Sequence, residues 1–405
     1  TAIVLLPAGL SRSAWIAVVV SCAWVYALYR LDRKQAATRL RQHKRWYIIG
    51  GILGGILLLG GSASLYTLKK DSADGRFLMW KITTKAIQKQ PITGTSLGGF
   101  PAAYAETQAE YMASGKATEQ EKLVAGCPEY AFNEYLQIGL EQGLVGLALF
   151  IGWLGLLFYK GIKNKRYACC GGLMSLAIFA FSSYPLQLPE FWVVLIFLGV
   201  MSVTPDKDEI RENQAESNGH RWGKQIFFMG IAILGIGLFW MQKDHYKAYQ
   251  QWNKAQMFYN NKAYEAALEV YEPLYPLLKH KPEFLFEAAQ SLSKTGQYEK
   301  ANEYLERAVL LSSDPMLYYV MAKNEQCLGE YRQAEKHLLH AIDILPERIY
   351  PYYLLMNLYT EPSYFQPAKL KMAIDSVLTK KPKVESSAIK EMKEKARSML
   401  NNTSI

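Results

Sequence analysis

The sequence has few of the residues that build metal sites and disulfide frameworks. Its 405 residues include 5 Cys and 6 His, with no Cys-x-x-Cys pair and no His/Cys group at the spacing of zinc ligands. We therefore expect neither a metal nor a cofactor. A disulfide between Cys127 and Cys327, the two cysteines outside the apolar runs, stays open at this stage. No GxxxxGK[ST] loop is present, which argues against nucleotide hydrolysis.

Charge is also scarce, but only in one part of the chain. The composition is 50% hydrophobic, 13% aromatic and 20% charged, with a net charge of +10. The aromatic content argues against a disordered chain, and the apolar residues gather in the first 241 positions. We predict an all-α protein with a membrane part at 1–241, a soluble repeat part at 246–382 and a helical tail at 383–405.

The membrane part is predicted from its apolar runs. A helix needs about 20 apolar residues to cross the hydrocarbon, and about 17 suffice. The run Thr1–Gly9 resembles the end of an earlier span, so we expect an N-terminally truncated protein. Six more runs predict a polytopic helical bundle, although the fifth is short and could be re-entrant, tilted or half of a hairpin: Ala14–Tyr29, Ile48–Tyr66, Ile138–Tyr159, Ala168–Tyr184, Phe191–Thr204 and Gln225–Met241.

Basic loops predict which side of the membrane each connection faces. Arg30–Arg45 holds seven basic residues and one acid, and Lys160–Arg166 holds four basic residues and no acid. Such loops face the cytoplasm and attract anionic lipid, so we expect a membrane-lipid partner and no nucleic acid. The long segment Thr67–Phe132 and everything after Met241 then lie on the opposite side.

A repeat of about 34 residues begins after Ala248. Its markers are the tyrosines Tyr264, Tyr298 and Tyr331, which lie 34 and 33 residues apart, and prolines that close the units at Pro282, Pro315 and Pro346. This pattern is typical of tetratricopeptide repeats, which stack into an α-solenoid with a concave groove. The groove either docks a protein partner or a substrate, or the array only stabilises the chain.

Chemistry is expected in the segment Thr67–Phe132, because the spans offer almost no ionisable groups. Connections well beyond about 15 residues in a compact protein are usually functional or disordered, and this one is not of low complexity. It contains Gly75-Arg76 with Trp80 and the glycine run Gly94…Gly98-Gly99-Phe100. The motif Asn133-Glu134…Gln137…Glu141-Gln-Gly143 follows it into the next span.

With Ser11-Arg12-Ser13 at the mouth of an earlier span, these motifs resemble the O-antigen ligase/polymerase superfamily, in the subtype with trailing tetratricopeptide repeats. The resemblance covers roughly residues 1–205. It implies an enzyme of the bacterial inner membrane that transfers a glycan from undecaprenyl diphosphate on the periplasmic face, without a metal. The acceptor would be lipid A-core in a ligase, another glycan in a polymerase, or a protein hydroxyl in an oligosaccharyltransferase. We favour the ligase reaction, because the repeats could dock a bulky acceptor.

Arginines suit a diphosphate leaving group, because the guanidinium is always charged and binds phosphate oxygens bidentately. Arg76 is the main candidate; for Arg12 a role as interfacial anchor is equally plausible. The predicted catalytic residues are Arg76, Glu129, Asn133 and Glu134. The predicted substrate-binding residues are Arg12, Trp80, Gly94, Gly98, Gln137 and Glu141.

One departure from the family pattern concerns the base. The resemblance implies a His directly before Asn133, where this chain has Phe132. Either a carboxylate deprotonates or orients the acceptor hydroxyl, or the reaction depends mainly on leaving-group stabilisation. The candidate carboxylates are Glu129 and Glu134, with Glu141 as a deeper third. Two structural readings stay open, a helix N-terminal acid for Glu134 and plain interhelical hydrogen bonding for Asn133, Gln137 and Glu141. The same departure favours a non-enzymatic envelope scaffold as the alternative.

Overall fold

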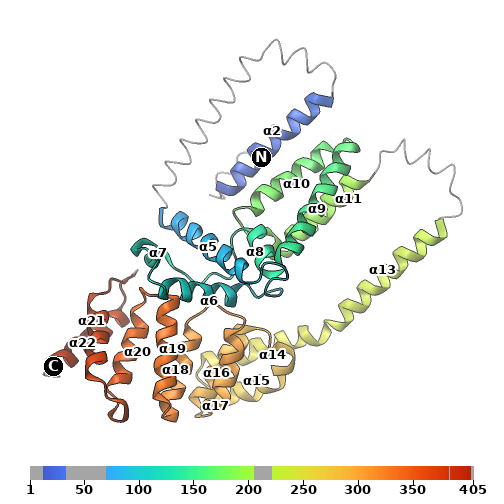
Figure 1. Ribbon diagram of the computed structural model, residues 1–405. Coiled ribbons are helices and arrows are strands. Elements are labelled where there is room, and N and C mark those ends of the chain that lie inside the picture. Colours follow the sequence, from blue (N-terminus) through green and yellow to red (C-terminus); the bar gives the residue numbers. More distant parts are fainter. Residues whose placement is uncertain (1–11, 33–69, 205–220, 383, 403–405) are drawn as a thin grey trace, which may run out of the picture. The chain divides into compact units, whose positions relative to one another are not determined.

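The computed structural model describes residues 12–32, 70–204, 221–382 and 384–402, and every regular element in these ranges is a helix (Figure 1). The all-α prediction is therefore confirmed for the described residues. The predicted runs at Thr1–Gly9 and Ile48–Tyr66 lie outside them.

The chain divides into two compact units that do not follow the chain order. Unit 1 comprises Thr1–Phe100 and Tyr130–Gln225, and unit 2 comprises Pro101–Glu129 and Ile226–Ile405. The chain therefore leaves unit 1 after Phe100, contributes 29 residues to unit 2, and returns at Tyr130. The two units are described separately below.

Unit 1 contains the apolar helices. Helices α9, α10 and α11 pack on one another, and α2 packs on α10. Helix α5 packs against the short helix α8. The helices have the bounds α2 Arg12–Asp32, α5 Lys70–Lys89, α8 Glu134–Glu141, α9 Gly143–Lys163, α10 Tyr167–Ala180 and α11 Pro189–Val203, with a 3₁₀ turn η1 at Pro185–Gln187.

The predicted span Ile138–Tyr159 is not one helix. It breaks at Gly143, whose φ of +69° is left-handed, so α8 ends and α9 begins there. A Cβ at Gly143 would lie 2.0 Å from the carbonyl oxygen of Ile92, and the Leu144 N–H donates to the Pro91 carbonyl at 2.8 Å. The prediction was wrong because glycine, which the apolar pattern tolerates, here allows a close approach of two backbones.

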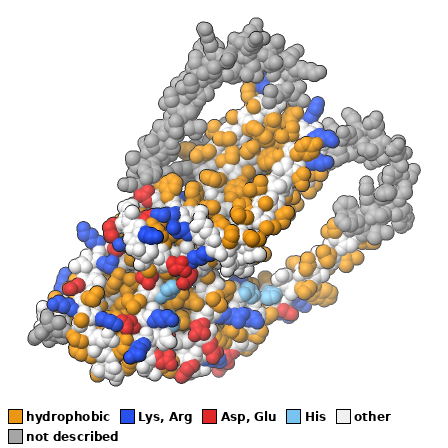
Figure 2. Space-filling view, viewed as in Figure 1, with side chains coloured by type: hydrophobic (Ala, Val, Ile, Leu, Met, Phe, Trp, Pro, Cys, Tyr) orange, Lys and Arg blue, Asp and Glu red, His pale blue; other side chains and the backbone are white. Residues whose placement is uncertain are grey.

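Two described helices are long and apolar enough to cross a membrane, α2 over Ser13–Arg30 and α9 over Gly143–Lys163. Helices α10 and α11 are apolar but shorter. Hydrophobic side chains cover the visible face of these helices, whereas charged side chains gather over the repeats (Figure 2). Leu149 and Val193 are 70% and 69% exposed, and apolar surface of this extent marks a lipid- or protein-facing side. The complete polytopic bundle stays a prediction.

The two ends of unit 1 differ in chemistry. At one end, Tyr26 and Tyr29 near the end of α2 line a cavity with Lys165 and Tyr167. At the other end, Ser13 near the start of α2 lines a cavity with Phe181 and Ser182. The basic connection Lys160–Arg166 thus lies at the same end of unit 1 as the last turns of α2.

Unit 2 is built from antiparallel helix pairs stacked in sequence (Figure 1). Small residues sit where paired helices touch, and Ala267, Ala301 and Ala334 are completely buried. Each lies three residues after a repeat tyrosine, as the motif predicts. The helices are α14 Lys243–Asn260, α15 Tyr264–Leu278, α16 Pro282–Lys294, α17 Tyr298–Val309, α18 Met316–Leu328, α19 Tyr331–Ile344, α20 Ile349–Tyr359, α21 Pro367–Thr379 and α22 Ser387–Asn402, preceded by α13 Arg221–Met241.

Part of the connection between α5 and α8 belongs to unit 2. It forms α6 Phe100–Ala113 and α7 Glu119–Val124. The completely buried amide of Gln108 donates to the carbonyls of Gly126 at 3.1 Å and Ile344 at 2.9 Å, and its oxygen accepts from the Tyr104 hydroxyl at 2.7 Å. Because a buried amide that loses its partners is costly, these bonds fix α6 on the repeat helix α19.

The repeat packing predicts the effect of enlarging a contact alanine. Ala301→Leu inserts three carbon atoms where two helices touch, so it should destabilise unit 2 by about 1–3 kcal/mol. Glu306→Leu, at an exposed position of the same helix, is the control and should change stability by less than about 0.5 kcal/mol. Limited proteolysis across a temperature series compares them; equal protection of the two variants would contradict the packing.

A second prediction concerns the turn at residues 90–99, which packs on α8. The Thr95 and Ser96 N–H groups donate to the carbonyls of Leu140 and Glu141 at 2.9 and 3.0 Å. Gly94 and Gly98 both have a left-handed φ, +70° and +75°. A Cβ at Gly94 would meet the Glu141 backbone at 2.5 Å, whereas one at Gly98 meets nothing within 4 Å.

Gly98→Ala should therefore lower the free energy of unfolding by about 1–2 kcal/mol, from backbone strain alone. Gly94→Ala should lower the free energy of unfolding clearly more than Gly98→Ala does, because the added Cβ also pushes the turn away from α8. Thermal unfolding of both variants in detergent measures the difference. Equal melting temperatures would show that the turn does not depend on this close approach.

Candidate active site

Arg76 is held at one end of unit 1 by two described contacts. It lies on α5, half-buried, and its guanidinium donates to the Ser182 carbonyl oxygen at 2.8 Å. The same group lies 5.1 Å from the centre of the Phe132 ring, within the range of a cation–π contact. The guanidinium is therefore fixed by the loop after α10 and by the loop before α8.

Trp80, one turn further along α5, fixes the same loop. Its indole N–H donates to the Ala131 carbonyl at 3.1 Å, and its ring meets the Phe181 ring edge-on at 5.6 Å. The Ala131 N–H in turn donates to the Gln137 side-chain oxygen at 3.1 Å. Both polar groups of Ala131, which is fully buried, are thus bonded to residues that the sequence predicts for the site.

Phe132 occupies the position where the family pattern has histidine. Its φ of +49° is left-handed, uncommon for a residue with a bulky side chain. The ring meets Tyr184 edge-on at 4.8 Å, and Tyr184 stacks on Tyr130 at 5.1 Å. The strained backbone therefore aims Phe132 at Arg76 and Tyr184, and this side chain offers no proton acceptor.

Asn133 and Glu134 begin α8 and are both buried. The Asn133 side-chain oxygen accepts the Leu136 N–H at 3.1 Å, which makes Asn133 the N-cap. The Glu134 carboxylate accepts the Leu186 N–H at 2.6 Å and the Gln187 amide at 3.2 Å. Glu134 therefore does more than complement the helix dipole, because it ties α8 to the turn η1.

Burial raises the pKa of Glu134 above its ordinary value, against the lowering effect of its bonds to Leu186 and Gln187. Removal from water penalises the charged carboxylate. A carboxyl group with a raised pKa holds its proton at a higher pH than an ordinary glutamate. Such a group suits proton transfer near neutral pH better than an exposed acid does.

Gln137 and Glu141 share one buried face of α8. The Gln137 amide donates to the Glu141 carboxylate at 3.3 Å. Glu141 also accepts backbone N–H groups from Gly98 and Phe100, which connects the glycine run to α8. Gly94 touches the Glu141 backbone as described above. These residues therefore build the support under the site, and the structure shows no direct route from them to Arg76.

A cavity of about 600 Å³ shares Ser182 with the Arg76 contact, although Arg76 itself does not line it. Two of its lining residues are Ser182, which accepts from Arg76, and Phe181, which packs on Trp80. Ser13 also lines it, so the start of α2 reaches the same cavity. Arg12 directly precedes Ser13, but its side chain is outside the described part of the chain.

Glu129 does not share this environment. It belongs to unit 2, where it is exposed and lines a cavity with residues of the repeats. Four residues that contact the predicted ones were not predicted from the sequence: Ser182, Tyr184, Leu186 and Gln187. The available signal was the short turn between the apolar runs Ala168–Tyr184 and Phe191–Thr204, which the alternation of predicted spans puts on the same side as Thr67–Phe132.

In the described ranges, no group of three or more His, Cys, Asp and Glu side chains is placed to hold a metal ion. Cys127 and Cys327 are not joined by a disulfide.

Comparisons with known proteins agree with the motif analysis. Residues 1–151 match the family model described as O-antigen ligase. Residues 260–341 match the model of anaphase-promoting complex subunit 3. A search of curated proteins finds no match.

Several solved structures are similar to the repeat part. A crystal structure of MamA is 17% identical and covers 38% of this chain and 88% of its own. MamA from Desulfovibrio magneticus RS-1 is 19% identical, and the match covers 39% of this chain and 98% of the MamA chain. A putative kinesin light chain with TPR-like repeats, from Podospora anserina, is 17% identical. This match covers 39% of this chain and 88% of the kinesin light chain. Each has a TM-score of 0.31, too low to carry an argument.

The match over residues 1–151 includes Arg76, Trp80, Asn133, Glu134 and Gln137, the residues on which the predicted resemblance was based. That resemblance is confirmed: the chain carries an O-antigen ligase family domain in residues 1–151, followed by tetratricopeptide-type repeats.

Proposed function

We propose that the chain is a membrane glycosyltransferase of the ligase type, which moves a glycan from undecaprenyl diphosphate to lipid A-core on the periplasmic face of the inner membrane. The observation that carries the proposal is the fixed Arg76 guanidinium, bonded to Ser182 beside a cavity of about 600 Å³. It lies inside the O-antigen ligase family match.

In this reaction the acceptor hydroxyl attacks the anomeric carbon of the glycan. The bond between that carbon and the diphosphate oxygen breaks, and undecaprenyl diphosphate leaves with the bonding electrons. Negative charge therefore grows on the diphosphate. A guanidinium fixed in advance stabilises this charge at little reorganisation cost, and its planar fork matches two phosphate oxygens. Arg12, at the start of α2, would supply a second positive charge.

The acceptor's proton needs a destination. Glu134 is the better candidate, because its pKa is raised by burial and its partners Leu186 and Gln187 lie in the turn beside Phe132. Glu129 is the second candidate. Asn133 caps α8 and so sets the position of Glu134. Trp80 and Gln137 fix Ala131 and thereby orient Phe132 against Arg76.

A scaffold without enzymatic activity is the second candidate function. The specific observation in its favour is Phe132, whose ring contacts Arg76 where the family pattern has a potential base. In that case the repeats would recruit an envelope partner and the membrane part would only anchor them. Polymerisation of glycans and transfer to protein hydroxyls differ from the main proposal in the acceptor.

Arg76→Ala should lower glycan transfer in cells about 10²–10³-fold, because the leaving diphosphate loses its preorganised charge. Arg76→Lys should restore little of the activity, because an ammonium lacks the planar fork. Lys85→Ala, an exposed position on the same helix, is the control. Mass spectrometry of lipopolysaccharide and glycoproteins identifies the acceptor. Wild-type surface glycan in the Arg76→Ala strain would leave the scaffold as the function.

The proton acceptor can be identified from pH profiles of Glu134→Gln and Glu129→Gln. A base works in its deprotonated form. Because the pKa of Glu134 is raised, its carboxyl group loses the proton at a higher pH than an ordinary glutamate does. Transfer by the wild type should therefore increase with pH through that range, and the increase should be absent in Glu134→Gln.

Glu190→Gln, at an exposed position of α11, serves as the control for this profile. If Glu129→Gln removes the pH dependence instead, Glu129 is the base. Full activity and an unchanged profile in both variants would exclude both carboxylates.

A further inference from the structure

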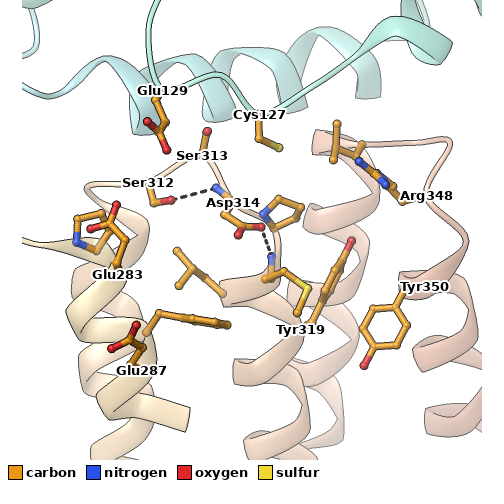
Figure 3. A pocket seen from close by; sticks show the side chains of 16 residues that line it. Cys127, Glu129, Glu283, Glu287, Ser312, Ser313, Asp314, Tyr319, Arg348 and Tyr350 are labelled. Carbon is orange, nitrogen blue, oxygen red and sulfur yellow. Dashed lines mark hydrogen bonds between the residues drawn. The ribbon is translucent and has the colours of Figure 1, made fainter. Parts of the chain in front are cut away.

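Two large cavities lie outside the candidate active site. One, of about 830 Å³, is formed within the repeats, and acids predominate among the charged residues that line it (Figure 3). The other, of about 900 Å³, lies in unit 1 between α2 and α10, which pack on each other (Figure 1). Lys165 is the one charged side chain among the described residues that line this second cavity. Its charge therefore has one sign, which indicates the kind of ligand it fits.

The middle of the cavity between α2 and α10 is apolar. Its walls there are Val18, Cys22 and Val25 of α2 with Ala168, Gly171 and Gly172 of α10. Two serines also line it, and the hydroxyl of one, Ser21, donates to the Val18 carbonyl of its own helix at 3.2 Å. Such a wall penalises charged or strongly hydrated groups, and it accepts a hydrocarbon chain.

One end of the cavity is polar and basic. Tyr26 and Tyr29, from the last turns of α2, line it together with Lys165 and Tyr167. The Tyr26 hydroxyl accepts from the Arg30 guanidinium at 2.9 Å, and this guanidinium lies 5.0 Å from the centre of the Tyr26 ring. Arg30 is therefore held at the same end as Lys165. Tyrosines and basic side chains are the groups that membrane proteins place at the level of the lipid headgroups.

The backbone around Lys165 is fixed. Its φ of +54° is left-handed, and its N–H donates to the Ile162 carbonyl at 3.1 Å. The amide of the preceding Asn164 donates to the carbonyls of Ser202 and Val203, both at 3.1 Å. These bonds hold the connection between α9 and α10 on the end of α11, so Lys165 stays at the basic end of the cavity.

The length of the cavity matches one leaflet of a bilayer. Its lining on α2 runs from Val18 to Tyr29, which corresponds to about 16 Å at 1.5 Å per residue. One leaflet contributes about 15 Å to a hydrocarbon core of about 30 Å. A cavity that is apolar over this depth and basic at one end is complementary to a lipid with an acyl chain and an anionic headgroup.

We propose that this cavity binds an anionic phospholipid, with one acyl chain between α2 and α10 and the phosphate beside Lys165 and Arg30. The proposal rests on the membrane placement in the proposed function, but not on the transfer reaction. The polyprenyl carrier fits less well, because its diphosphate has to reach Arg76, which is bonded to Ser182 at the other end of unit 1. The bound lipid fills the space between two helices and so stabilises the position of α2.

The test measures lipid binding to the purified full chain by titration in native mass spectrometry. Palmitoyl-oleoyl phosphatidylglycerol is compared with palmitoyl-oleoyl phosphatidylethanolamine, because the two lipids share their chains and differ in the net charge of the headgroup. The wild type should bind phosphatidylglycerol at least about five-fold more tightly. Equal binding of the two lipids would overturn the proposal.

Undecaprenyl phosphate is the competing probe in the same titration. If it fails to displace phosphatidylglycerol at equimolar concentration, the assignment to a phospholipid is supported. Displacement would assign the cavity to the polyprenyl carrier, and the proposal would fail.

Lys165→Asn removes the cation and keeps the left-handed backbone, which asparagine adopts more readily than most residues. It should weaken phosphatidylglycerol binding about five-fold and leave phosphatidylethanolamine binding unchanged. Lys163→Asn is the matched control, at an exposed lysine two residues earlier that does not line the cavity. Equal losses in the two variants would show a general attraction to the basic connection and contradict the site.

Ala168→Phe fills the apolar part of the cavity with a ring and should weaken the binding of both lipids. Ala23→Phe, at an exposed position of α2 that does not line the cavity, should keep wild-type binding. Unchanged lipid binding in Ala168→Phe would contradict the position of the acyl chain. If Ala168→Phe does not fold, Lys165→Asn decides by itself.

Arg76→Ala separates this proposal from the proposed function. If it loses glycan transfer and keeps phosphatidylglycerol binding, both proposals are supported. If it keeps transfer while Lys165→Asn still loses phosphatidylglycerol, the lipid site stands and the transfer mechanism fails. If it loses transfer and the wild type binds both lipids equally, only the lipid site fails. Recovery of the full chain from the aqueous phase without detergent would overturn the membrane placement and both proposals with it.

Discussion

The candidate site depends on the two hydrogen bonds that hold the backbone of Ala131. Trp80 donates to its carbonyl, and Gln137 accepts its N–H. With both groups fixed and the residue buried, the chain has one path into α8, and Phe132 takes a left-handed conformation on it. Arg76 then finds the Phe132 ring on one side and the Ser182 carbonyl on another. This clamp and the edge-on contact with Tyr184 together keep Phe132 against the guanidinium.

The second organising feature is the route of the connection between α5 and α8. It leaves unit 1 after Phe100, is fixed on α19 by the buried Gln108, and returns three residues before Asn133. Cys127 and Glu129 on the way back line a cavity of the repeats.

The predictions from sequence succeeded where one local pattern sufficed and failed where distant backbones meet. The tyrosine and alanine spacing predicted the repeat pairs, because helix pairs pack through contacts at fixed separations. The apolar run at 138–159 predicted one helix, but Gly143 ends it, because the Ile92 backbone approaches too closely for any other residue. Glu129 and Glu134 lie five residues apart, yet the former belongs to unit 2 and the latter to unit 1.

The sequence by itself determined the all-helical class, the repeat array and the motifs that match the O-antigen ligase family model. Periodicity, composition and motif order are properties of the chain that no folding step alters. Only the tertiary structure decided that Ser182 and Phe132 hold Arg76 and that Glu134 is buried on the turn Pro185–Gln187. Burial and hydrogen-bond partners depend on residues far apart in the sequence, such as Arg76 and Ser182 or Gln108 and Ile344, and local pattern carries no information about them.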